Sequence, residues 1–335
     1  MGIKMTSKVW FIGVALVAGA CGDDASTPID APKAVDAAPD ALEEEPVNFM
    51  SDEGGEVRFE YVRFGVGTGT REGTASTRVI SYFEADDDVD FHAYPTIPGC
   101  TLMTDDTKWP TSQPVNRKYV DIGQQLTLTN GTKILNVPKA TVPGDPLARM
   151  HGVGNHYFFA PFPDATSNPP QPNGDSATYI QEKTSYDVIF SGSDTWPAQV
   201  HKDAIFMPAA FDLISPSATT PVALQAGTAM TFTWQVVPSG QPAGVPDAWF
   251  LVGFVIPNTG MVVACVEPMN DGSMTVPAEY VDMIRTAAPN GGTLVRQSFI
   301  HQVVELTNGT TVKNRRIDTI GTWCHATGFS IAPAI

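Results

Sequence analysis

Basic side chains are scarce in this 335-residue sequence: 20 Lys and Arg stand against 36 Asp and Glu, with a formal net charge of −16. A protein that binds nucleic acid needs a basic surface for the phosphates, so we do not expect nucleic acid as a partner. The four cysteines are too few for a disulfide-dense mini-protein or a zinc scaffold. With 29 Gly and 28 Pro, the composition also argues against a long coiled coil.

Long hydrophobic runs are missing as well. The longest one near the N-terminus, Val9–Ala18, is too short to cross a bilayer core of about 30 Å as a helix. Lys4 and Lys8 precede it and small residues follow it, which is typical of a secretory signal. No later run reaches the roughly 18 residues that a membrane helix needs. We therefore predict a signal peptide over residues 1–20 and no membrane helix after it.

The signal ends in Ala18-Gly19-Ala20 followed by Cys21, which resembles the lipobox of bacterial lipoproteins. The resemblance implies that Cys21 is lipidated and becomes the mature N-terminus, and that the lipid is the protein's contact with the membrane. Gly22 rather than Asp follows the cysteine, which favours the outer membrane, with the protein facing the periplasm or the cell surface. The alternative is an ordinary secretory signal cleaved near Ala20, with Cys21 incidental.

Residues 21–50 then change composition, with Ala, Asp and Pro at short spacing and eight acids against Lys33 alone. Such a segment has too little apolar surface to offset the entropy of ordering. We expect a disordered acidic tether.

From Gly54 onward, apolar and polar residues alternate with the period of two that indicates β-strands. Asn130-Gly131 and Asp271-Gly272 are turn dipeptides, and the Gly-rich segment 65–69 reads as a hairpin loop rather than a phosphate-binding loop. Only Pro277–Ala287 has the pattern of a helix. The expected strands are Glu56–Phe64, Arg78–Glu84, Ala198–Met207, Ala229–Val237, Trp249–Ile256, Gly260–Val266, Thr293–Leu306 and Gly321–Ile331.

The expected fold class is all-β, with two β-sandwich-like domains in tandem at residues 51–210 and 211–335. The segment after Phe211 resembles the opening strands of immunoglobulin-like or fibronectin-like modules, because a first strand and a Pro/Ser turn precede a strand that carries Trp234. About 120 residues remain for this second domain, which suits a β-sandwich with one short helix.

Several stretches, taken in order, resemble a family of uncharacterised two-domain lipoproteins of myxobacteria and related predatory bacteria. The resemblance covers nearly the whole chain, and it implies location and architecture without implying any chemistry. The stretches that carry it are the lipobox with CGDD, the acidic tether, Pro98–Cys100 (PGC), Asp121–Gly131 (DIGQQLTLTNG), Tyr186–Ala198 (YDVIFSGSDTWPA), Phe211–Pro216 (FDLISP), Phe232–Gln235 (FTWQ), Cys265 and Asp271–Val281 (DGSMTVPAEYV).

Three cysteines remain after Cys21, and an exported compartment permits disulfides. Cys265 and Cys324 both fall in strands of the second domain, so a bridge between them is one expectation, with Cys100 as a free thiol. The alternative is three buried thiols that act as small hydrophobic side chains.

Two clusters are candidate metal sites, and no other cofactor is expected. Asp86, Asp88 and Asp90 supply the hard oxygens that Ca²⁺ prefers, but the favoured interpretation of this cluster is a solvated run of charges at a strand edge. His151 and His156 flank a Gly-rich turn and are candidate Zn²⁺ ligands, or else surface histidines.

Aromatic side chains precede the long Pro/Asn/Gly loop at 163–176. Tyr157, Phe159 and Phe162 are therefore candidates for the lip of a binding site for sugar or peptide. The alternative is a core strand followed by a surface loop.

Catalytic signatures are missing, since the sequence has no GxSxG elbow, HExxH motif or SxxK motif. The sequence thus favours a non-catalytic lipoprotein of the cell envelope, with a role in binding, adhesion or structure and with an unidentified protein or glycan as ligand. The alternative is a lipid-anchored hydrolase acting on polysaccharide, with its catalytic residues dispersed on loops.

Overall fold

The computed structural model describes residues 53–69, 72–73, 75–84, 98–104, 120–139, 156–159, 179–194, 196–217, 221–238, 240–256, 261–306 and 315–332. The fold is all-β with one α-helix in the described part. The elements are β1 Glu53–Phe64, β2 Ala75–Glu84, β3 Gly99–Thr104, β4 Gln125–Thr129, β5 Ile134–Pro138, β6 His156–Phe159, β7 Thr184–Phe190, β8 Gln199–Met207, β9 Leu213–Ser215, β10 Val222–Leu224, β11 Met230–Trp234, β12 Trp249–Val255, β13 Met261–Pro268, η2 Met269–Asp271, β14 Ser273–Val276, α3 Ala278–Ala287, β15 Gly292–Leu306 and β16 Arg315–Ile331.

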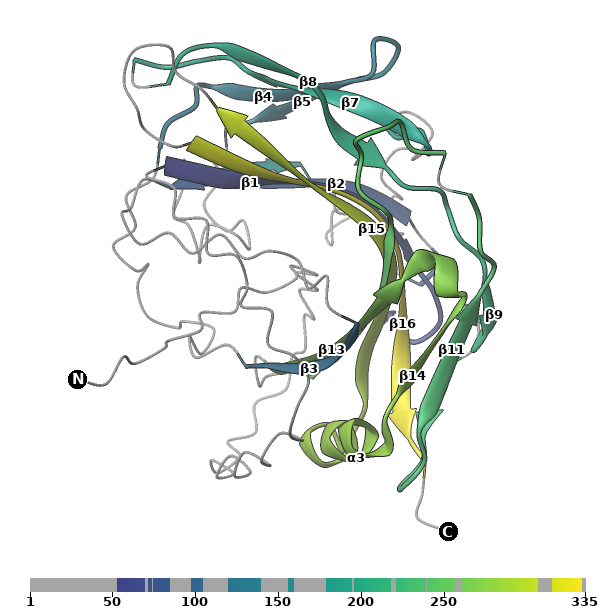
Figure 1. The fold of residues 1–335 in the computed structure, drawn as a ribbon. Coiled ribbons are helices and arrows are strands. Elements are labelled where there is room, and N and C mark those ends of the chain that lie inside the picture. The colour runs from purple at the N-terminus through teal and green to yellow at the C-terminus, as the bar shows by residue number, and fades with distance from the viewer. Residues whose placement is uncertain are drawn as a thin grey trace, which may run out of the picture.

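The largest element of the fold is a nine-stranded sheet. Its strands follow the order β3-β13-β12-β15-β16-β1-β2-β6, and the ninth strand, β10, pairs with β16 outside this order. Its centre is β16, which pairs antiparallel with β15 over Arg315–Phe329 and parallel with β1 over Arg315–Ala326. The sheet bends strongly along these long strands (Figure 1).

Two smaller sheets cover this sheet at different places. The four-stranded sheet β5-β4-β7-β8 lies over β1 and β2, whereas β14-β11-β9 lies beside β15 and β16 (Figure 1). Each pair of layers encloses its own apolar core, as in a β-sandwich. Helix α3 closes the second core with Val281 and Ile284.

The alternation in β1 explains how the first core forms. Val57, Phe59 and Tyr61 point toward the four-stranded sheet and are buried there, because side chains one strand position apart point to opposite faces. The predicted hairpin after β1 is also present, since β1 and β2 pair antiparallel around the Gly-rich segment. Each of the eight predicted strands overlaps a strand of the structure, and the predicted helix is α3.

The expectation of two tandem domains needs one correction. The apolar core does change near residue 210, since Met207 belongs to the first core and Phe211 to the second. The sheet, however, does not break there: β1 pairs with β16, and β3 pairs with β13 of the C-terminal half. The two sandwich-like lobes therefore share one sheet, and neither contains all of its strands within its own half of the chain.

The disulfide also differs from the expectation. Cys265 is bonded to Cys100, and Cys324 is a buried free thiol. Cys100 and Cys265 are direct partners in the register of β3 and β13, and their Cα atoms lie 3.9 Å apart. Cys324 lies on β16, which the strand order separates from β13 by two strands. The bridge fastens a strand of the N-terminal half to the edge of the C-terminal lobe.

Removing this bridge is expected to destabilise the fold. We expect the C100A variant to lose about 2–4 kcal/mol of unfolding free energy, because the bridge closes a long loop, and the loss is measured by denaturant unfolding. Reductant should lower the stability of the wild type and leave that of C100A unchanged. The C324A variant is the control and should keep its sensitivity to reductant. If C100A retained that sensitivity instead, the pairing described here would be wrong.

Candidate binding surface

The outward face of the four-stranded sheet is a polar surface on a rigid base. Along β4 and β5, Leu126, Leu128, Leu135 and Val137 point inward and are buried in the first core. Gln125, Thr127 and Asn136 occupy alternate positions and therefore point outward. Thr127 and Asn136 are direct cross-strand partners. We call these three side chains the polar row.

The polar row is ordered by its own hydrogen bonds. Gln125 Nε2 donates to Thr127 Oγ1 and to Asn136 Oδ1, each at 2.9 Å, and Thr127 Oγ1 donates to Asn136 Oδ1 at 2.9 Å. These bonds use the donor end of the Gln125 amide and the acceptor end of the Asn136 amide. Among the described residues, neither the Gln125 carbonyl oxygen nor the Asn136 amino group takes part in these bonds, so both can still hydrogen-bond to another molecule.

Apolar and charged groups flank the polar row. Ile134 on β5 is 61% exposed and Val200 on β8 is 53% exposed. Lys202 Nζ lies 2.5 Å from Asp187 Oδ2, and the amide of Asp203 donates to Asp187 Oδ1 at 3.0 Å. The face therefore combines amides, a hydroxyl, an ion pair and small apolar patches, which is a mixture typical of binding surfaces.

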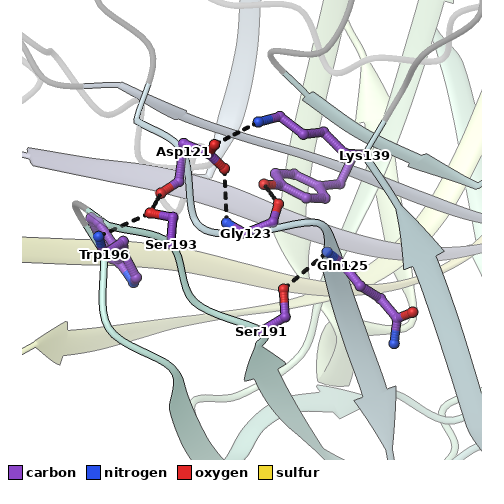
Figure 2. Close-up of polar contacts among 8 residues, drawn as sticks. Asp121, Gly123, Gln125, Lys139, Ser191, Ser193 and Trp196 are labelled. Carbon is purple, nitrogen blue, oxygen red and sulfur yellow. Dashed lines mark hydrogen bonds and ion pairs between the residues drawn. The ribbon is translucent and has the colours of Figure 1, made fainter.

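At one end of the polar row, two loops are hydrogen-bonded to each other. We call this region the loop junction (residues 120–125 and 191–196). Gly192 N donates to the carbonyl of Ile122 at 2.9 Å, and Ser193 Oγ donates to that of Asp121 at 2.5 Å. Figure 2 shows that Ser191 holds the backbone of Gln125, the first residue of the polar row, through a 3.0 Å bond. The junction therefore fixes the start of β4.

Glycine is required at the loop junction. Gly123 has a φ of +114° and Gly192 a φ of +83°, which side chains of L-residues rarely adopt. A Cβ atom on Gly123 would overlap Ser191 Oγ and the carbonyl oxygen of Gly192. The DIGQQ and SGSDTW stretches, about 70 residues apart in the sequence, thus meet backbone to backbone.

The charged part of the loop junction is Asp121 (Figure 2). Lys139 Nζ lies 2.9 Å from Asp121 Oδ2, and the amide of Gly123 donates to Oδ1 at 2.9 Å. Partial burial alone would raise the pKa of Asp121, but these two partners lower it below the ordinary value of 3.8. Asp121 is therefore held as a carboxylate at neutral pH, and it positions the loop rather than transferring protons.

Tyr157 lies against the same loop, and here the prediction of a ligand lip is wrong for this residue. Its side chain is 1% exposed, and its hydroxyl donates to the carbonyl of Gly123 at 2.5 Å. Burial, followed by the negative charge of Asp121, raises the pKa of Tyr157 far above 10.0, so the phenol stays protonated. Tyr157 belongs to the core, because β6 pairs with β2 and directs this ring at Phe83.

The other predicted site residues stay untested. Cys21, the tether, Asp86, Asp88, Asp90, His151 and Phe162 lie outside the described residues, and for His156 and Phe159 the structure describes only their place on β6. Among the described residues, no group of three His, Cys, Asp or Glu side chains is placed to hold a metal ion. In the same part of the chain, no helix is long and apolar enough to cross a membrane.

Charged side chains also lie buried on the far face of β1 and β2, opposite the first core. Arg58 Nη2 is 2.5 Å from Glu56 Oε1 and Arg58 Nε is 3.8 Å from Glu60 Oε1, while Arg78 Nη2 is 3.5 Å from Glu60 Oε2. Burial raises the pKa of Glu56, although the charge of Arg58 opposes the rise. Buried charges are tolerated when they are paired, so we assign this ladder a role in the fold.

A second buried pair lies on the same face of the sheet. His301 Nε2 and Asp318 Oδ1 are 2.7 Å apart on the neighbouring strands β15 and β16. Neither this pair nor the polar row was predicted from the sequence. The available signal for the row was the alternation of Leu with polar residues in QLTLT and ILNVP, which predicts strands but not the pairing of their polar faces.

No protein-family model matches the chain, and no curated protein matches it significantly.

A pH titration tests the role of Asp121. Because the folded pKa of Asp121 is depressed, its contribution to stability is present above the unfolded pKa and is lost as the pH falls through the folded value. We expect D121N to be less stable than the wild type at pH 7 and the difference to vanish well below pH 3.8. Denaturant midpoints across this pH range measure it. D194N, which changes an exposed acid of the same junction, should alter stability little at any pH; a pH-independent D121N effect would contradict the assignment.

Proposed function

We propose that the protein is a lipid-anchored protein of the cell envelope with a non-catalytic binding role, and that the polar row binds a hydroxyl-rich glycan. The observation that supports this proposal is the pre-ordered network of amide and hydroxyl groups formed by Gln125, Thr127 and Asn136. Sugars present hydroxyl groups that both donate and accept. The unused Gln125 carbonyl and Asn136 amino group match such a pair, and ordering them in advance lowers the entropic cost of binding.

Two features of the chain support the envelope location. The lipobox-like segment before Cys21 and the acidic tether suit an exported lipoprotein. The Cys100–Cys265 bridge suits an oxidising compartment, because disulfides persist outside the cytosol.

We further infer that the C-terminal lobe is immunoglobulin-like. Its small sheet β14-β11-β9 faces β12, β15 and β16 across one core. In the immunoglobulin fold, strands A, B and E face strands C, F and G in the same way. The fold by itself says little about function. Its relevance is that such lobes present faces and loops for binding on a rigid base.

The binding proposal is tested with the lipid-anchored full chain and purified envelope polysaccharides. We expect saturable binding to at least one glycan, weakened about tenfold or more in the double variant Q125A/N136A, since each lost hydrogen bond is worth about 1 kcal/mol. Q235A, which removes an exposed amide of the C-terminal lobe, is the matched control and should bind like the wild type. Equal binding by the double variant would overturn the proposed surface.

Anchoring is tested separately by fractionation of cells that express the protein. C21S is expected to move from the membrane to the soluble fraction of the envelope, because no lipid can be attached. C324A, which changes the buried thiol, should remain with the membrane. Continued membrane retention of C21S would rule out lipidation at this residue and leave the binding test unaffected.

A further inference from the structure

Three basic side chains form a row across adjacent strands, on the face of the large sheet that the small sheets cover. In the registers of the sheet, His325 on β16 is the partner of Arg63 on β1 and also of Arg296 on β15. Neighbouring strands are about 4.8 Å apart, so both arginine side chains reach the space around the imidazole. We call Arg63, His325 and Arg296 the basic row.

Arg296 is the unusual member of the basic row. It is 0% exposed, and its Nη2 donates to Thr327 Oγ1 at 2.8 Å. Its Nε and Nη1 atoms have no hydrogen-bond partner among the residues that the structure describes. Burying a guanidinium costs several kcal/mol unless an anion or several acceptors compensate, and one neutral hydroxyl compensates only in part. The site is therefore short of acceptors.

The neighbours of Arg296 do not remove this shortage. Trp323, two residues before His325 on β16, has a buried indole Nε1 that also lacks a hydrogen-bond partner within the described part of the chain. Phe211 packs against the His325 ring with 5.1 Å between centroids, and Arg63 Nε donates to the Tyr61 hydroxyl at 3.3 Å. These groups add donors and aromatic faces but no negative charge.

Acidic groups are distant or exposed. Asp212, which enters from the segment between β8 and β9, influences His325 electrostatically, but its side chain is exposed and makes no ion pair with either arginine in the described part of the chain. The Cys324 thiol lies on the other face of β16, and burial followed by the charge of Glu60 raises its pKa. It therefore supplies no anion at neutral pH.

We propose that the basic row is a binding site for a small oxyanion, with Arg63 at the solvent end and Arg296 at the buried end. The exposure of the three side chains decreases from Arg63 through His325 to Arg296. An oxyanion of the carboxylate or phosphate type accepts hydrogen bonds from guanidinium groups and would satisfy the donors that this chain leaves unpaired. The site is separate from the polar row and does not depend on the proposed function.

The protonation states agree with this geometry. Burial, then the charges of Arg296 and Arg63, lower the pKa of His325 to about 4, although a hydrogen bond to the Phe211 backbone opposes this shift. The imidazole is therefore neutral at pH 7, and the two arginines are the groups that would bind the anion. Burial lowers the pKa of Arg296 to about 10, which still leaves the guanidinium charged at neutral pH. An anion between the two arginines therefore meets two full positive charges.

The test measures anion binding to the full chain at constant ionic strength. We expect phosphate or succinate, but not chloride, to raise the melting temperature saturably, with one site per chain in equilibrium dialysis. In R296M the affinity should fall at least tenfold. R296M should itself fold, because replacing a poorly paired buried charge by an apolar side chain is often neutral or stabilising.

Two further variants test whether the anion binds at the basic row. R63Q should weaken binding while leaving the buried end intact, and K202M, which changes an exposed cation on the four-stranded sheet, should bind like the wild type. A response to phosphate alone identifies a phosphate-type ligand, and a response to succinate alone identifies a carboxylate. Saturable binding that survives in R296M and R63Q, or no response to either anion, would overturn the proposal.

Discussion

The pairing of β16 on both of its long edges is the constraint on which the rest of the structure depends. One edge joins the antiparallel strand β15 and the other joins β1 in parallel, so the first and last described strands lie side by side. A parallel pair cannot be closed by a tight turn. The chain between them must therefore build both lobes before the sheet is complete, and each lobe is attached to the same central strands.

This shared sheet explains where the polar groups lie. On one face, β1 and β2 bury the ladder of Glu56, Arg58, Glu60 and Arg78, whose charges pair with one another. On the other face, the basic row lies where the first core gives way to the second, and within the described residues no acid forms an ion pair with its arginines. Polar residues that alternate with core residues in a strand are usually solvated; in this protein the ladder on one face and Arg296 on the other are buried. Whether such a buried charge is paired then decides how much its burial costs in free energy.

On the outer face of the four-stranded sheet, by contrast, the polar side chains are not buried. This face is solvated, and its polar side chains bond to one another across β4 and β5, while the loop junction fixes the backbone beneath them. Because the core side chains on the inward face are closely packed, the backbone that carries the outward side chains cannot shift without breaking strand pairing. That rigidity is what a weak, hydroxyl-rich ligand requires of a binding surface, since little ordering entropy is lost on binding.

The sequence by itself determined the local elements. Period-two alternation identified the long strands, the Gly-rich segment after Phe64 predicted a hairpin, and the Pro277–Ala287 pattern predicted the only helix among the described residues, since each of these depends on neighbours within a few positions. Only the tertiary structure decided that Cys265 bonds to Cys100, that Tyr157 is a core residue, and that Arg296 meets His325. Those facts depend on which strands become neighbours in the sheet, and alternation within one strand carries no information about its partner or its register.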